Sequence, residues 1–141
     1  MDATGWDARY AKGQVWSSEP NRFFAEIVDG LVADGRVPGR AIDLACGEGR
    51  NAVWLAEQGW QVTAVDFSAV GVERGRAGAA AKGIAADWVV ADLAMWDLGI
   101  AAWDLVAHVY LHWPTHERVP FLQRCAAAVA PGGVLVVVGH D

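Results

Sequence analysis

The segment AIDLACGEGRN, residues 41 to 51, carries an aspartate, a cysteine and two glycines at the end of an apolar run. The residues before the glycines are typical of a short buried strand, and residues 50 to 58 have the spacing of a helix. Gly47 and Gly49 allow a tight turn that brings backbone N–H groups close to a ligand. The spacing therefore predicts a nucleotide-binding loop between a strand and a helix.

Two kinds of nucleotide cofactor fit this loop. Residues 47 to 52, GEGRNA, satisfy the dinucleotide pattern G-x-G-x-x-G/A, which by itself is a weak signal. Asp66 ends the next predicted strand, where a carboxylate accepts both ribose hydroxyls of either cofactor. Glu48 would repel a pyrophosphate, whereas S-adenosylmethionine carries an ammonium and a sulfonium. The pattern predicts a nucleoside ligand, and charge favours the methyl donor.

Strand and helix patterns alternate around this loop. Helices are predicted at residues 21 to 34, 50 to 58, 68 to 82 and 116 to 129, and strands at 40 to 46, 60 to 66, 86 to 90, 103 to 110 and 134 to 139. Apolar strands joined by helical crossovers indicate a parallel sheet that is covered on both faces. The predicted fold is α/β, with a doubly wound, Rossmann-like and mostly parallel sheet of about five strands. Pro120 disturbs the last helix, because proline removes a backbone hydrogen bond.

Length and composition limit the remaining possibilities. With 141 residues, 54% of them hydrophobic, the chain fits one domain, in which residues 1 to 39 form a lid and helix segment and residues 40 to 141 form the core. The two cysteines have no C-x-x-C spacing, so neither a zinc site nor a disulfide is expected, and the cytoplasm is the predicted location. Neither an apolar leader nor a membrane span is predicted. A net charge of -6 without a basic stripe argues against nucleic-acid partners.

Beyond these patterns, the run DLACGEG resembles the first motif of class I S-adenosylmethionine-dependent methyltransferases, D/E-x-G-x-G-x-G, with Ala45 in place of the first glycine. VDFS at residues 65 to 68, ADL at 91 to 93 and VAPGGVLVVVG at 129 to 139 are similar to later segments of the same family, in the family's order. The resemblance implies that S-adenosylmethionine is the cofactor and S-adenosylhomocysteine the product. The residues implied to hold the cofactor are Asp43, Ala45, Cys46, Gly47 and Gly49 for the methionine portion and its loop, Asp66 for the ribose, and Phe67, Asp92 and Leu93 for the adenine.

The amino-terminal run WDARYAKGQVWSSEPNRFF further resembles bacterial small-molecule methyltransferases of the tellurite- and thiopurine-resistance type. In that group a leading segment folds over the cofactor, which implies Tyr10 and Trp16 as aromatic lids and Arg9 as a carboxylate partner. The alternative is that these rings merely cover the edge of the sheet. The resemblance implies a small-molecule methyl acceptor.

Methyl transfer needs no covalent catalytic residue, because the sulfonium already activates the carbon. A general base is needed where the acceptor must lose a proton, and His112, after the fourth predicted strand, is the first candidate. A structural hydrogen-bonding role for His112 is the alternative, and no residue set with metal-ligand spacing is found.

The sequence departs from the family at its end. The family's sheet has seven strands, whereas this sequence stops after the predicted fifth strand. Three interpretations stay open: a fragment that lacks the last two strands, a homodimer through the exposed edge of the fifth strand, or a shortened domain. Two rival functions also stay open, a non-catalytic module that binds S-adenosylmethionine or S-adenosylhomocysteine, and an NAD-dependent oxidoreductase domain.

Overall fold

A computed structural model describes residues 2–12, 19–111 and 113–139. The described chain forms five helices and five strands. In chain order they are α1 (Ala3–Ala11), α2 (Arg22–Ala33), β1 (Arg40–Leu44), α3 (Arg50–Glu57), β2 (Gln61–Asp66), α4 (Ala69–Ala81), β3 (Asp87–Val90), β4 (Trp103–Val109), α5 (Thr115–Ala128) and β5 (Val129–Val138). The predicted alternation of strands and helices is confirmed, with boundaries that differ by a few residues.

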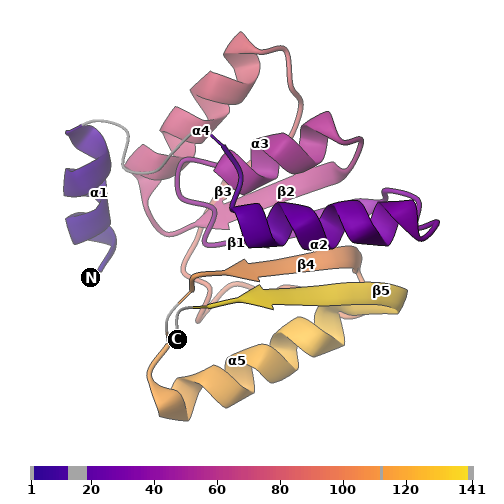
Figure 1. Ribbon diagram of the computed structural model, residues 1–141. Helices are drawn as coiled ribbons and strands as arrows, with labels where there is room; N and C mark the ends of the chain where they lie inside the picture. The colour runs from indigo at the N-terminus through magenta and orange to yellow at the C-terminus, as the bar shows by residue number, and fades with distance from the viewer. Residues whose placement is uncertain (1, 13–18, 112, 140–141) are drawn as a thin grey trace.

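The five strands make one sheet in the order β3-β2-β1-β4-β5, and every pairing is parallel. The chain moves outward from β1 through β2 to β3, then crosses back to β4 on the other side of β1. This reversal is the topological switch point at which doubly wound sheets bind ligands. The carboxyl ends of the strands face the side on which α1 lies (Figure 1).

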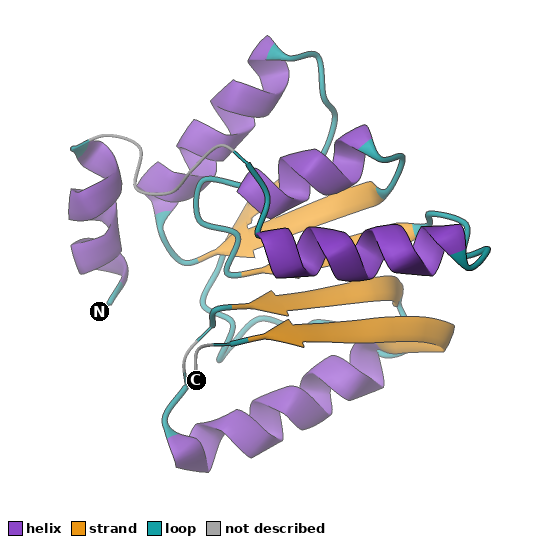
Figure 2. Ribbon diagram, viewed as in Figure 1, coloured by secondary structure: helices purple, strands orange, loops and turns teal. Residues whose placement is uncertain are grey.

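Helices cover both faces of the sheet, as predicted (Figure 2). The alternation of side chains along β1 shows this division. Ala41 packs in one apolar cluster with side chains of α2 and α3, whereas Ile42 and Leu44 pack in a second cluster with side chains of α5. Both faces of β1 are buried, and this explains why Ala41, Ile42 and Leu44 are apolar, whereas the buried Asp43 is an exception.

Local signals in the sequence set the ends of several elements. The Asn21 side chain caps α2 by accepting from the Phe24 N–H at 3.0 Å, and Ser68 caps α4 by accepting from the Gly71 N–H at 3.1 Å. Gly59 follows α3 with φ +99°, the left-handed backbone that the sequence predicts there. Pro120 lies inside α5, which begins at Thr115, so the helix continues through the proline.

Two features go beyond the sequence prediction. Two of the three glycines of α4 reflect close packing: a Cβ at Gly71 would lie 2.9 Å from the Tyr10 ring, and a Cβ at Gly75 would lie 2.6 Å from the Trp88 ring. Helix α1 was not predicted as a helix, and it begins with a side-chain cap, in which Asp2 accepts from the Gly5 N–H at 2.8 Å. The amino-terminal segment therefore folds as a helix that packs on α4.

Candidate functional site

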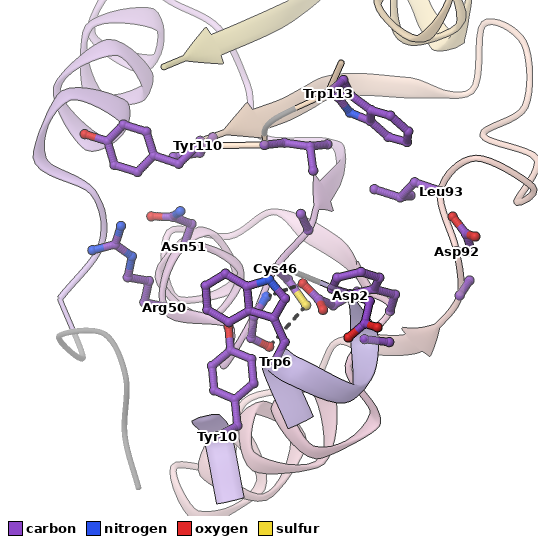
Figure 3. A pocket seen from close by; sticks show the side chains of 18 residues that line it. Asp2, Trp6, Tyr10, Cys46, Arg50, Asn51, Asp92, Leu93, Tyr110 and Trp113 are labelled. Atoms are coloured by element: carbon purple, nitrogen blue, oxygen red, sulfur yellow. Dashed lines mark hydrogen bonds between the residues drawn. The ribbon is translucent and has the colours of Figure 1, made fainter. Parts of the chain in front are cut away.

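A pocket of about 590 Å³ opens at the carboxyl ends of the strands. Its described walls come from the loops after β1, β2, β3 and β4, together with α1 and the start of α3. In Figure 3, Arg50 and Asn51 lie on one side of the pocket and Asp92 and Leu93 on the other. The volume is in the range of small-molecule sites, and the position is that expected for a ligand in a doubly wound fold.

The loop after β1 has a left-handed backbone at three positions. Ala45 has φ +59°, Gly47 +56° and Gly49 +83°. Ala45 therefore holds a conformation that favours glycine, which accounts physically for the glycine at this place in the family motif. Ala45, Cys46 and Gly47 line the pocket as predicted. Burial, followed by the charges of Asp43 and Asp66, raises the pKa of the Cys46 thiol, so the thiol is protonated and is not a nucleophile.

Gly49 does not line the pocket. A Cβ at this position would lie 2.4 Å from the Trp88 ring, so the glycine is needed for packing against β3. Glu48 also lies outside the pocket lining, and its carboxylate lies 3.9 Å from the Arg74 guanidinium. The predicted repulsion of a pyrophosphate by Glu48 therefore has no direct geometric basis.

The negative charge of the pocket comes from other side chains. Its described lining residues include three carboxylates, of Asp2, Asp66 and Asp92, and one cation, Arg50. This balance favours a ligand with positive charge.

Asp43 lies at the carboxyl end of β1, beneath the glycine loop and outside the pocket lining. It is 1% exposed, and its Oδ2 atom has no hydrogen-bond partner. Burial, and after it the negative charge of Asp66, raises the pKa of Asp43 from 3.8 to about 7, although the Ala52 N–H and the charge of Arg50 oppose the rise. A buried carboxyl with an unpaired oxygen is costly, so it is a candidate for interaction with a cationic ligand group.

Asp66 lines the pocket at the end of β2 and joins two loops. Its Oδ2 accepts from the Gly47 N–H at 2.9 Å, and its Oδ1 accepts from the Ser68 N–H at 2.8 Å. Burial raises the pKa of Asp66, and these backbone hydrogen bonds oppose the rise. An ionised carboxylate has about four lone-pair sites, so both oxygens can still accept from ligand hydroxyls.

The remaining predicted nucleoside contacts come together on the other side of the pocket. Phe67, Asp92 and Leu93 all line it. The Asp92 Oδ1 atom accepts from the Ala94 N–H at 2.9 Å. This hydrogen bond closes a tight turn and fixes the direction of the carboxylate. The pocket therefore combines an apolar surface and an acidic group at one end.

Helix α1 closes one side of the pocket with Trp6 and Tyr10, whose rings stack at 5.6 Å. Tyr10 is 3% exposed and packs over Gly71, so it anchors α1 on α4. Asp7 strengthens this docking, because its Oδ1 accepts from the Ser68 hydroxyl at 2.5 Å. Asp2 and Asp7, which look like ordinary surface charges in the sequence, thus lie in the pocket wall and in a helix contact.

Several lining residues have no role predicted from the sequence, among them Arg50, Asn51 and Tyr110. Position offered a signal for Arg50 and Asn51, because the first residues of a helix after a glycine loop face the ligand. Tyr110 has a left-handed backbone with φ +52°, and the presence of a tyrosine does not predict this conformation. Arg9, predicted as a carboxylate partner, does not line the pocket, and its guanidinium lies 4.9 Å from the centre of the Trp6 ring. The predicted lid Trp16 and the predicted base His112 lie outside the described residues.

Comparison with known proteins decides the family. Residues 41–133 match a family described as "Methyltransferase domain". The chain belongs to this family. The class I methyltransferase fold and S-adenosylmethionine as the family's cofactor are thereby confirmed, and the weak dinucleotide pattern does not indicate NAD.

Three similar proteins illustrate this methyltransferase family. The ribosomal RNA small subunit methyltransferase C of Alcanivorax borkumensis is 43% identical over 111 residues, which cover 73% of this chain and 33% of the relative. The tRNA 5-carboxymethoxyuridine methyltransferase of Escherichia coli K12 is 34% identical over 106 residues, 72% of this chain and 40% of the relative. The structure of magnesium protoporphyrin IX methyltransferase from Synechocystis PCC 6803 with bound S-adenosylmethionine is 30% identical, with a TM-score of 0.64, and covers 74% of this chain and 52% of that one. The chain thus spans about a third to two fifths of the curated relatives' length.

These relatives correct one prediction. The resemblance in the amino-terminal segment predicts a small-molecule acceptor. The negative net charge predicts that the protein has no nucleic-acid partner. That exclusion is wrong, since two relatives that match nearly three quarters of this chain are named as rRNA and tRNA methyltransferases. Net charge describes the whole surface, whereas an acceptor is recognised by the pocket and its rim. Separately, no helix among the described residues is long and apolar enough to cross a bilayer.

Proposed function

We propose that this methyltransferase domain binds S-adenosylmethionine in the pocket and transfers its methyl group to a nucleoside of RNA. Cofactor binding, the first part of this proposal, is supported by a geometric observation: the loops after β1, β2 and β3 all contribute to one cavity. These three loops supply the glycine turn, the ribose acceptor Asp66 and the acidic and apolar adenine contacts. The described residues fit the cofactor, because the cavity has room, donors and acceptors for each of its parts.

The nucleoside half of the cofactor would lie between Asp66 and the loop after β3. Asp66 would accept from the two ribose hydroxyls, since its backbone hydrogen bonds already hold the carboxylate in place. Phe67 and Leu93 would contact the faces of the adenine, and the Asp92 carboxylate would accept from its amino group. An apolar slot with one directed acceptor is the usual way to select a base.

The methionine half would extend along the loop after β1 toward α3. Ala45 to Gly47 would contact it through the backbone, and the charge of Asp43 beneath the loop would stabilise its ammonium. Arg50, the single cation among the described lining residues, would bind its carboxylate. Tyr10 would cover the cofactor from α1; the same role for Trp16 remains an expectation.

When bound, S-adenosylmethionine supplies a methyl carbon that is activated by the neighbouring sulfonium. The chain's own residues would orient the acceptor in line with that carbon and exclude water. Trp6, Tyr110 and Trp113 line the pocket and provide aromatic surface for this task. The predicted base His112 would be used only where the acceptor must lose a proton.

Support for an RNA acceptor comes from the named relatives and from this aromatic lining. Proteins that modify RNA bases commonly bind unstacked nucleotides against aromatic side chains. Because the chain carries a net charge of -6, we expect recognition of the base to outweigh contact with phosphates. The two buried free cysteines fit the cytoplasmic location that forms part of this proposal.

The first test is calorimetric titration with S-adenosylmethionine, S-adenosylhomocysteine and NAD, using wild type, Asp66→Asn and the surface control Asp87→Asn. We expect the first two ligands to bind and NAD not to bind. Asp66→Asn should weaken binding by about a hundredfold, because it removes charge-assisted hydrogen bonds, and the control should not change it. Binding of NAD in place of S-adenosylmethionine would overturn the cofactor assignment.

The acceptor is tested by transfer of a radioactive methyl group from S-adenosylmethionine to total tRNA, small-subunit rRNA or a pool of small metabolites. If nuclease digestion of the labelled RNA recovers the radioactive methyl group in one nucleoside, the result supports the proposal. Tight cofactor binding without transfer to any pool would instead favour the non-catalytic binding module.

A further inference from the structure

Arg124 on α5 holds the loop that carries two of the proposed adenine contacts. Its guanidinium donates to the Leu93 carbonyl at 2.8 Å from Nη1 and to the Trp96 carbonyl at 2.5 Å from Nη2. Asp92 lies directly before the first of these carbonyls. The planar guanidinium thus bridges two points of one loop, a geometry that the single ammonium of lysine cannot reproduce.

The loop needs such support because it follows an edge strand. β3 pairs with β2 on one side, and the chain then leaves the sheet. The loop keeps one backbone link to β2, from the Ala91 N–H to the Asp66 carbonyl at 2.9 Å, and its next contacts are local turns onto Asp92. Leu93 and Leu98 of the same loop pack in an apolar cluster, whereas Met95 between them is 84% exposed. Arg124 anchors this loop from α5 at Leu93 and Trp96, and the Trp103 indole N–H of β4 anchors it further along at the Leu98 carbonyl.

Arg124 is itself oriented by an aromatic side chain of its own helix. Its guanidinium lies 5.6 Å from the centre of the Phe121 ring, one turn earlier on α5. Phe121 in turn stacks on Trp113 at 4.5 Å, and Trp113 lines the pocket after β4. A pair of residues on α5 therefore connects the adenine side of the pocket to the side that we assign to the acceptor.

We infer that Arg124 is a positioning residue for adenine recognition, acting through the Leu93 and Trp96 carbonyls to aim the Asp92 carboxylate at the adenine amino group. This inference rests on the proposed function, in which Asp92 accepts from that amino group. Arg124 does not line the pocket, so its effect on the ligand passes through the loop.

The test compares two probes that differ only in the base. S-Inosylhomocysteine carries a carbonyl oxygen where S-adenosylhomocysteine carries the amino group, and a proton on the neighbouring N1, so the ratio of their dissociation constants reports recognition of this edge of the base, which includes the contact with Asp92. We expect wild type to prefer S-adenosylhomocysteine by at least about tenfold, the value of a hydrogen bond to a charged group. Arg124→Gln should reduce this preference to about twofold, and Arg124→Lys should recover only part of it. Arg118→Gln, an exposed arginine on the same helix, is the matched control and should keep the full preference.

Each result has a distinct meaning. If Arg124 has a merely structural role, its substitution will weaken the binding of both probes equally and leave the ratio of dissociation constants unchanged, and this result would overturn the inference. A wild type that binds both probes equally would overturn it as well. If wild type binds neither probe, the proposed function itself fails. Thermal unfolding of each variant, measured with the same samples, confirms that a changed ratio comes from folded protein.

Discussion

Replacing Asp43 by asparagine should make the protein more stable at pH 8 and less able to bind its cofactor. The pKa of this buried carboxyl rises from 3.8 to about 7, chiefly because of burial. At about 1.4 kcal/mol per pH unit, such a rise corresponds to a cost on the order of 4 kcal/mol when the carboxyl is ionised. Asparagine has nearly the same shape and removes the charge, but its buried amide N–H groups would lack an acceptor, which costs about 1–3 kcal/mol.

The sign of the pH dependence follows from the proton that the folded protein retains. Between about pH 4 and pH 7 the folded Asp43 binds more protons than the unfolded one, so this group lowers the free energy of unfolding as pH rises through that window. We therefore expect Asp43→Asn to be about 1–3 kcal/mol less stable than wild type near pH 4.5. Near pH 8 it should be more stable than wild type by a similar amount.

Urea unfolding of both proteins at pH 4.5, 6 and 8 measures this crossing, because titrations shared by the two proteins cancel in the difference. Asp29→Asn, an exposed change on α2, is the control and should show no crossing. A stability difference between Asp43→Asn and wild type that stays constant from pH 4.5 to pH 8 would refute the reasoning. In the same samples, S-adenosylmethionine should bind the variant at least about tenfold more weakly, since the charge beneath the ligand's ammonium is gone.

Two further substitutions test other parts of the site. Gly71→Ala places a methyl group 2.9 Å from the Tyr10 ring and should displace α1, so S-adenosylhomocysteine should bind several-fold more weakly; Gly78→Ala, with open space around it, should instead stabilise α4 by about 1 kcal/mol. Unchanged binding by Gly71→Ala would mean that α1 does not cover the ligand. Arg50→Gln should weaken the binding of S-adenosylhomocysteine by about tenfold. It should not change the binding of 5′-methylthioadenosine, which lacks the amino acid. Equal losses for both ligands in calorimetry would exclude Arg50 as the carboxylate partner.

The sheet could be predicted from the sequence because its signals are local. Apolar runs, capping residues such as Asn21 and Ser68, and the glycine after α3 specify elements without knowledge of the rest of the molecule. Asp66 could be placed in the site for the same reason, since it ends a strand at the switch point of the sheet.

The features that could not be predicted from the sequence depend on tertiary contacts. Helix α1 is held by Tyr10 on Gly71 and by Asp7 on Ser68, pairs that lie about 60 residues apart in the sequence. Gly49 matches the motif but serves packing against Trp88, a distinction that spacing cannot make. The exclusion of nucleic-acid partners is wrong for a different reason: net charge is a sum over the surface, and a pocket selects its ligand with a few residues.

Several costly features of the described chain lie around the pocket. Ala45 and Tyr110 hold left-handed backbones in its walls, and Asp43 keeps an unpaired buried oxygen beneath it. Stability alone would favour glycine at the first two positions and an apolar side chain at the third. A carboxyl that is costly when ionised in the free protein becomes favourable beside a cation, so the ligand that we propose would recover part of that cost on binding. The unpaired buried carboxyl of Asp43 therefore supports a cationic methyl donor more strongly than the glycine pattern does.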